Sequence, residues 1–137
     1  TVILDGAHNP EGVKALVEEL SGFRPGRTIR LLFATMSDKE WELMLRSLAA
    51  VVDEVVFTKV EMERSADPRQ LAEKLGAIPH RIIFDSRTAL RALVDEAQED
   101  DVIVVAGSLY LLGEVRPLVE EIARARTTPS TSTPTQL

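Results

Sequence analysis

Short runs of β-branched residues alternate along the chain with longer stretches whose apolar residues return every three or four positions. Val2–Leu4 and Val102–Val105 are uninterrupted aliphatic runs that predict strands. Across Pro10–Leu20, apolar residues instead follow the helical period, and Pro10 suits the first turn of a helix. This alternation predicts an α/β fold in which strands and helices take turns.

The same pattern extends over most of the chain and places a helix after each strand. The predicted strands are Val2–Leu4, Thr28–Thr35, Glu54–Val60, Arg81–Phe84 and Asp101–Ala106. The predicted helices are Pro10–Leu20, Lys39–Val51, Pro68–Gly76, Ser86–Ala97 and Leu112–Ala125, with Ser37 or Asp38 capping the second and Ser86 the fourth. We therefore predict a three-layer Rossmann-like domain over residues 1–126, with a mostly parallel sheet and helices on both faces. Residues 127–137, mostly Thr, Pro and Ser, are predicted to be a disordered tail.

Three segments rich in chemically useful side chains follow predicted strands. They are Asp5–Pro10, Thr35–Lys39 and Gly107–Arg116. Ligands of open α/β sheets bind beyond the carboxyl ends of the strands, so a site is expected among these segments. The pattern does not give the order of the strands, so it leaves open which segments are neighbours.

Composition narrows the class of protein. The chain has 137 residues, 45% of them hydrophobic, which fits one soluble domain. Its net charge is −6, and no basic stripe stands out, so neither nucleic acid nor an anionic membrane is an expected partner. The absence of cysteine excludes thiolate nucleophiles and disulfides. We expect a cytoplasmic location, and because Thr1 directly precedes a strand, we expect the chain to begin inside a longer protein.

The turn after the first strand carries the most varied chemistry. Asp5 can accept hydrogen bonds from ribose hydroxyls, and His8 can donate to a phosphate or exchange a proton near neutral pH. Pro10 starts a helix whose amino terminus favours anions. The same residues also fit an ordinary strand-to-helix turn, in which Asn9 caps the helix and Asp5 accepts backbone N–H groups.

Several runs along the chain resemble a known family. Asp5-Gly6-Ala7-His8-Asn9-Pro10 is similar to the signature of folylpolyglutamate and dihydrofolate synthases, which belong to the Mur ligase superfamily. Gly107-Ser108-Leu109-Tyr110-Leu111 and Gly113-Glu114-Val115-Arg116 resemble the family's Gly-Ser-Leu-Tyr-Leu…Gly-Glu-Val-Arg run. Asp38-Lys39-Glu40 resembles an Asp-Lys-Asp motif with Glu40 in place of the second Asp, and Arg64-Ser65-Ala66 resembles Pro-Arg-Ala without its Pro. Matched motifs in the same order are more specific than any one alone.

The resemblance implies an ATP-dependent ligase that joins glutamate to a folate or dihydropteroate carboxylate through an acyl phosphate. It implies His8 as a catalytic residue, Asp5, His8 and Asn9 as ATP-binding residues, and Ser108 and Tyr110 as glutamate-binding residues, with no metal ligand in this domain. ATP and Mg would be held mainly by an amino-terminal P-loop domain of the same parent chain. The resemblance further implies a monomer, and a fragment that is inactive alone because half of a two-domain site cannot exclude water.

Other interpretations of the sequence also remain open. The chain could be a peptidoglycan-type Mur ligase domain or a nucleotide-binding module without ligase activity. A hydrolase built on Ser108 and His8 is disfavoured, because the sequence lacks the Gly-x-Ser-x-Gly elbow. The sequence also lacks the glycine motifs of a complete P-loop ATPase and of a dinucleotide-binding Rossmann domain. Tyr110 could be a core aromatic residue with its hydroxyl at the surface, and Lys39 a solvated helix residue.

Overall fold

A five-stranded parallel sheet with the strand order β1-β5-β2-β3-β4 forms the centre of the computed structural model, which describes residues 1–24 and 26–127. The strands are β1 (Val2–Leu4), β2 (Ile29–Phe33), β3 (Glu54–Lys59), β4 (His80–Asp85) and β5 (Val102–Ala106). The helices are α1 (Pro10–Ser21), α2 (Trp41–Ala49), α3 (Pro68–Glu73), α4 (Ser86–Glu96) and α5 (Leu109–Thr127). The predicted α/β fold is confirmed, and every described strand pair is parallel.

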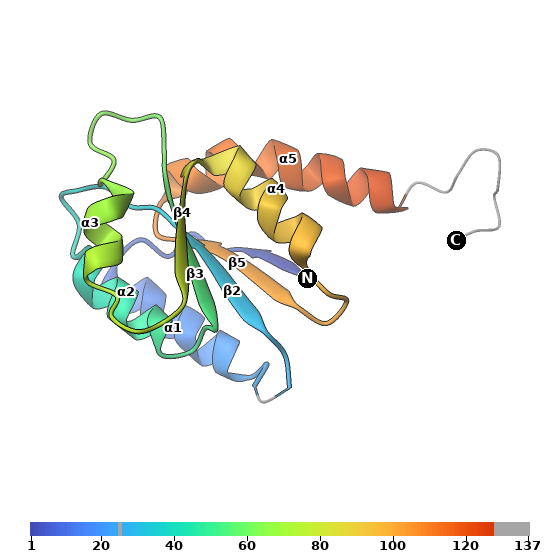
Figure 1. Cartoon of the computed structure of the whole chain (residues 1–137), viewed down its shortest axis with the longest axis horizontal. Helices are drawn as coiled ribbons and strands as arrows, with labels where there is room; N and C mark the ends of the chain where they lie inside the picture. The colour runs from blue at the N-terminus through green and yellow to red at the C-terminus, as the bar shows by residue number, and fades with distance from the viewer. Residues whose placement is uncertain (25, 128–137) are drawn as a thin grey trace.

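Helices cover both faces of the sheet, with α1, α2 and α3 on one side and α4 and α5 on the other (Figure 1). Two separate apolar clusters fill the spaces between the layers. One joins Leu16 of α1 and Leu45 of α2 to Leu31 and Phe57 of the sheet. The other cluster joins the opposite face of the sheet to α4 and α5. Its aliphatic side chains include Leu32, Val56, Leu90, Leu93, Leu111 and Val115.

The position of β5 between β1 and β2 shapes the carboxyl edge of the sheet. After β5 the chain enters α5 on one face, whereas after its neighbours β1 and β2 the chain enters helices on the other face. The loops therefore diverge at the carboxyl edge on either side of β5, which is where α/β sheets bind ligands. The three segments expected at this edge follow β1, β2 and β5, so the structure makes them neighbours.

Two predicted helix caps are wrong. Neither Ser37 nor Asp38 caps α2, because that helix starts only after Glu40, whose side chain makes no capping bond. Asp85 rather than Ser86 caps α4, since its carboxylate accepts the N–H of Thr88 at 2.9 Å. Hydrogen bonds from Thr88 hold the pKa of the Asp85 carboxyl below its usual range.

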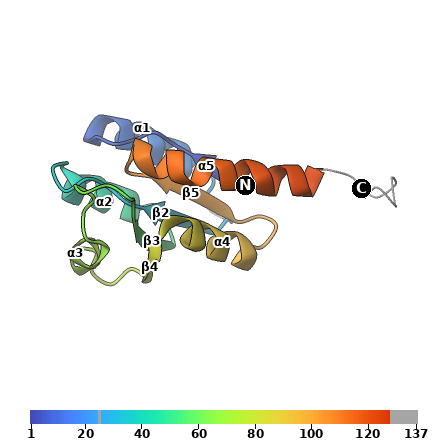
Figure 2. The ribbon, with the colours of Figure 1, turned by 90° about the horizontal axis from the view of Figure 1, so that it is seen from above.

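The last helix begins earlier than the pattern predicts. It starts at Leu109 instead of Leu112 and ends at Thr127. The predicted tail therefore overlaps the structure only at Thr127, and its other residues, 128–137, lie outside the described residues. The final turns of α5 extend past the sheet (Figure 2). No helix in the described part of the chain is long and apolar enough to cross a membrane.

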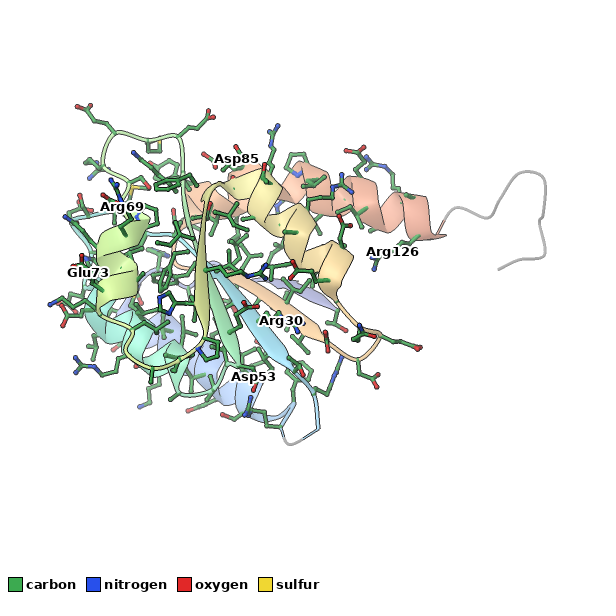
Figure 3. All side chains as sticks on the ribbon, in the orientation of Figure 1. Arg30, Asp53, Arg69, Glu73, Asp85 and Arg126 are labelled. Carbon is green, nitrogen blue, oxygen red and sulfur yellow. The ribbon has the colours of Figure 1, made fainter. Side chains whose placement is uncertain are left out.

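Charged side chains bind one another at the amino edge of the sheet, opposite the carboxyl edge where the loops diverge. Arg30 lies 2.6 Å from Asp101 and 3.3 Å from Glu54, whose carboxylate also binds Arg81 at 2.9 Å. The N–H of Gln98 and the Arg30 guanidinium hold the pKa of the Asp101 carboxyl below its usual range. Figure 3 shows Arg30 and Asp85 at opposite ends of the sheet, so this charge network stands apart from the loops that follow the strands.

Candidate functional site

The turn between β1 and α1 is held by its own polar groups. The Asp5 carboxylate accepts the N–H of Ala7 at 2.8 Å, and Asn9 caps α1 by accepting the N–H of Gly12 at 2.8 Å. His8 Nδ1 lies 2.7 Å from the carbonyl oxygen of Gly6. Because a carbonyl only accepts, Nδ1 carries the proton, and Nε2 of the neutral ring keeps its lone pair. The capped-turn interpretation is therefore correct, and it leaves Nε2 without a role in the turn.

The turn between β5 and α5 closes against the first turn. Gly107 donates its N–H to the carbonyl oxygen of Ala7 at 3.0 Å. Its φ is 107°, and a Cβ built there would overlap the Ala34 oxygen and lie 2.8 Å from the Phe33 ring. Only glycine fits this conformation and this close approach.

Ser108 explains why α5 starts where it does. Its Oγ accepts the N–H of Tyr110 at 3.1 Å and the N–H of Leu111 at 3.4 Å, which is the work of a helix cap. The side chain is buried, yet it lines a cavity at the carboxyl edge. Both contacts use Oγ as an acceptor, so the hydroxyl proton remains available to a ligand.

A cavity of about 210 Å³ opens at the carboxyl edge beside Ser108, and we call it the Ser108 cavity. It collects residues from the loops after β1, β2, β3 and β5. Its walls are His8, Met36, Lys39, Arg64, Gly107, Ser108, Leu109 and Tyr110. The predicted glutamate-binding residues and His8 thus lie together.

A second cavity, of about 340 Å³, also has His8 in its wall, and we call it the Asp5 cavity. Asp5 and Asn9 line it together with Gly12 and Glu19 of α1. The predicted site residues are therefore divided: Asp5 and Asn9 face one cavity, Ser108 and Tyr110 face the other, and His8 lines both.

The two cavities differ in charge. The Ser108 cavity carries the cations Lys39 and Arg64, whereas the Asp5 cavity carries the carboxylates of Asp5 and Glu19. Arg64 is held 2.8 Å from Asp38, and both side chains are more than half exposed. A cationic pocket attracts carboxylate or phosphate groups, and an acidic one accepts hydrogen bonds from hydroxyls.

Tyr110 is not a core residue. It is 48% exposed at the start of α5, next to Leu109, which is 57% exposed. Arg64 and Lys39, which stand out in the sequence only within the weaker motif matches, both line the Ser108 cavity. The Asp-Lys and Arg-Ser-Ala resemblances were the available signals.

Comparison with known proteins gives the family. Residues 1–109 match the family described as Mur ligase, glutamate ligase domain. The chain belongs to this family. The dihydrofolate synthase/folylpolyglutamate synthase of Mycobacterium tuberculosis is 33% identical over 135 residues, which cover 86% of this chain and 28% of the relative. The UDP-N-acetylmuramoyl-L-alanyl-D-glutamate–2,6-diaminopimelate ligase of Caldanaerobacter subterraneus is 30% identical over 115 residues, covering 77% and 23%.

A solved structure agrees with the fold of the domain. The bifunctional folylpolyglutamate synthase/dihydrofolate synthase of Yersinia pestis, complexed with AMPPNP and Mn ion, superposes with a TM-score of 0.80 at 33% identity. The match covers 87% of this chain and 28% of that one. The chain therefore spans less than a third of the length of each of these proteins. The family resemblance drawn from the sequence is confirmed.

Proposed function

We propose that this domain forms one wall of the active site of an ATP-dependent ligase that joins glutamate to a carboxylate of a folate or dihydropteroate. Bound ATP, with its metal ion, would supply the phosphoryl group that activates the carboxylate as an acyl phosphate. Attack by the glutamate amine on the acyl carbon expels phosphate and leaves the amide. The isolated domain is expected to be inactive, since a second domain must close the site.

The observation that carries the proposal is that His8 lines two cavities of opposite charge. Lys39 and Arg64 give the Ser108 cavity two cations, which match the two carboxylates of glutamate. In the Asp5 cavity, Asp5 and Glu19 offer acceptors to ribose hydroxyls. An amino acid in one cavity and a nucleotide in the other would thus both lie next to His8.

Ser108, Tyr110 and His8 each supply one polar group that can contact the glutamate substrate. The Ser108 hydroxyl donates its proton to a glutamate carboxylate, because its lone pairs already accept from the N–H groups of α5. Tyr110, half exposed, adds a phenol at the mouth of the cavity. His8 Nε2 takes the proton that the glutamate ammonium must lose before its nitrogen can attack.

The Asp5 cavity supplies fewer groups for binding ATP. One oxygen of Asp5 is used by Ala7 N–H, which leaves the other for a ribose hydroxyl, and the amide N–H₂ group of Asn9 is left as a donor. Within the described residues, no group of three His, Cys, Asp or Glu side chains is arranged to hold a metal ion. As the family resemblance implies, Mg and most contacts to the phosphates are left to the partner P-loop domain.

A peptidoglycan-type ligase is the second candidate. It is favoured by the match to the diaminopimelate ligase of Caldanaerobacter subterraneus, at 30% identity. The same cavity would then receive a diaminopimelate amine and carboxylate. Supplying the full-length ligase with dihydropteroate, tetrahydrofolate or a UDP-muramoyl dipeptide as acceptor separates the two candidates by which acceptor gains an amide.

The amino-acid site is tested by Lys39→Gln and Ser108→Ala in the full-length ligase. Each change removes one donor to a carboxylate, so the KM for glutamate is expected to rise roughly tenfold while the KM for ATP stays unchanged. Lys74→Gln is the matched control, because Lys74 is an exposed lysine at the end of α3 and lines neither cavity. Unchanged glutamate KM in both variants contradicts the assignment.

A further inference from the structure

The loop between β3 and α3, residues 60–67, folds on itself above the carboxyl edge of the sheet (green, Figure 1). Ser65 donates its N–H to the Met62 oxygen at 3.0 Å, and its hydroxyl oxygen accepts the N–H of Val60 at 3.1 Å. These bonds join the two ends of the loop, so a shift at one end is passed to the other.

One side of this loop binds the segment after β2. Ser37 donates its N–H to the Arg64 oxygen at 2.7 Å, and Ala66 donates to the Thr35 oxygen at 2.8 Å. This pairing brings Arg64 to the Ser108 cavity. The position of the Arg64 cation therefore depends on the position of the loop.

The other side of the loop is held by Glu114, which lies on α5. One carboxylate oxygen of Glu114 accepts the N–H of Glu61 at 2.6 Å, and the other accepts the hydroxyl of Ser86 at 2.7 Å. The backbone oxygen of Glu114 accepts Nε of Arg87 at 3.2 Å. One side chain thus joins α5 and the start of α4 to the β3–α3 loop.

We propose that Glu114 is a positioning residue, which holds the β3–α3 loop and thereby sets Arg64 against the Ser108 cavity. Glu114 does not line that cavity; it lines two other hollows, of about 130 Å³ and 430 Å³, which include neither Arg64 nor Ser108. Its influence on a ligand therefore passes through the loop. The inference deepens the proposed function and rests on it, because it takes Arg64 as a partner of a substrate carboxylate.

The chemistry of the contact distinguishes two substitutions. In Glu114→Gln the amide oxygen still accepts the Glu61 N–H, and the amide N–H₂ donates to the Ser86 oxygen, because a hydroxyl can also accept. Glu114→Ala removes both contacts. Glutamine is therefore expected to rescue what alanine loses, which a purely charge-based role would not allow.

The kinetic test uses the full-length ligase. Glu114→Ala is expected to raise the KM for the amino acid roughly tenfold, equivalent to about 1.4 kcal/mol, with the KM for ATP unchanged. Glu114→Gln is expected to stay within about twofold of the wild type, and Ser86→Ala to fall between them, because it removes one of the two contacts. Glu120→Ala is the matched control, since Glu120 is an exposed glutamate on the same helix.

Amide hydrogen exchange of residues 60–66 in the 137-residue chain measures the loop directly. Faster exchange in Glu114→Ala, with wild-type exchange in Glu114→Gln, supports the proposal. Equal loss in both variants, or wild-type exchange and KM in Glu114→Ala, overturns it. If Glu114→Ala does not fold, wild-type loop exchange and KM in Ser86→Ala overturn it and faster exchange with a raised KM supports it. Arg64→Gln tests the proposed function separately: an unchanged amino-acid KM there refutes the cavity assignment while the exchange result still judges the Glu114 contact.

Discussion

Replacing Gly107 with alanine is expected to destabilise the domain strongly, for two reasons that add. The backbone φ of 107° costs a residue with a side chain ~1–2 kcal/mol. The new methyl group would also overlap the Ala34 oxygen and press on the Phe33 ring, and forcing an extra carbon into a packed site costs roughly 1–3 kcal/mol. The total, about 2–5 kcal/mol, is a large part of the stability of a typical domain.

Two other glycines separate these causes. Gly76 has a φ of 82°, but a Cβ there would meet open space among the described residues, so Gly76→Ala is expected to cost only the strain, ~1–2 kcal/mol. Gly113 lies within α5, has no positive φ and is also open. Gly113→Ala is therefore expected to stabilise the domain by about 0.5–1 kcal/mol through helix propensity.

Thermal unfolding followed by circular dichroism ranks the stabilities of the three glycine variants. For a chain of this size each kcal/mol moves Tm by roughly 3–5 °C, so Gly107→Ala is expected to melt at least ~6 °C below the wild type. The Tm of Gly76→Ala should lie between those of Gly107→Ala and the wild type, and the Tm of Gly113→Ala should lie above that of the wild type. If Gly107→Ala melts at or above Gly76→Ala, the close approach between the β5–α5 turn and β2 is not what the geometry implies.

Two further changes test the cap of α1 and the charges at the amino edge. Asn9→Ala is expected to lower the free energy of unfolding by ~1 kcal/mol through loss of the bond to Gly12, whereas Asn9→Asp keeps an acceptor; equal urea midpoints for the two variants would contradict this. Asp101→Asn should destabilise the domain near neutral pH, because the N–H of Gln98 and the charge of Arg30 keep the Asp101 pKa below 3.8. That stabilisation is present above pH 3.8 and lost as the pH falls through the lower folded-state pKa, so the difference between Asp101→Asn and the wild type in urea unfolding should shrink in acid.

The hydrophobic pattern predicted the elements well because it records local periodicity. It could not predict the strand order, since the pairing of Ile3 with Val104 depends on contacts about a hundred residues apart. Caps were harder still. Asp85 and Ser86 are both good caps by residue type, and the backbone decides between them: Asp85 is extended (φ −87°, ψ 123°), whereas Ser86 is already the first residue of the helix.

The candidate site was predicted unevenly for the same reason. His8 and Ser108 stand in turns directly after strands, so their place at the carboxyl edge follows from local sequence. Arg64 lies in the middle of a loop, and only the pairing of Met36 with Ser65 brings it to the cavity. Tyr110 was open to a core interpretation because the start of α5 was expected three positions later, which hid its position in the first turn.

The place of β5 between β1 and β2 also bears on how the domain is made. β1 pairs with β5 alone, and β2 shares one of its two edges with β5. During synthesis, β1 would therefore remain without its partner, and an edge of β2 would stay open, until residues 102–106 leave the ribosome. Among the described elements only α5 follows β5, so the sheet is completed late, and open strand edges, which favour aggregation, persist until β5 is available.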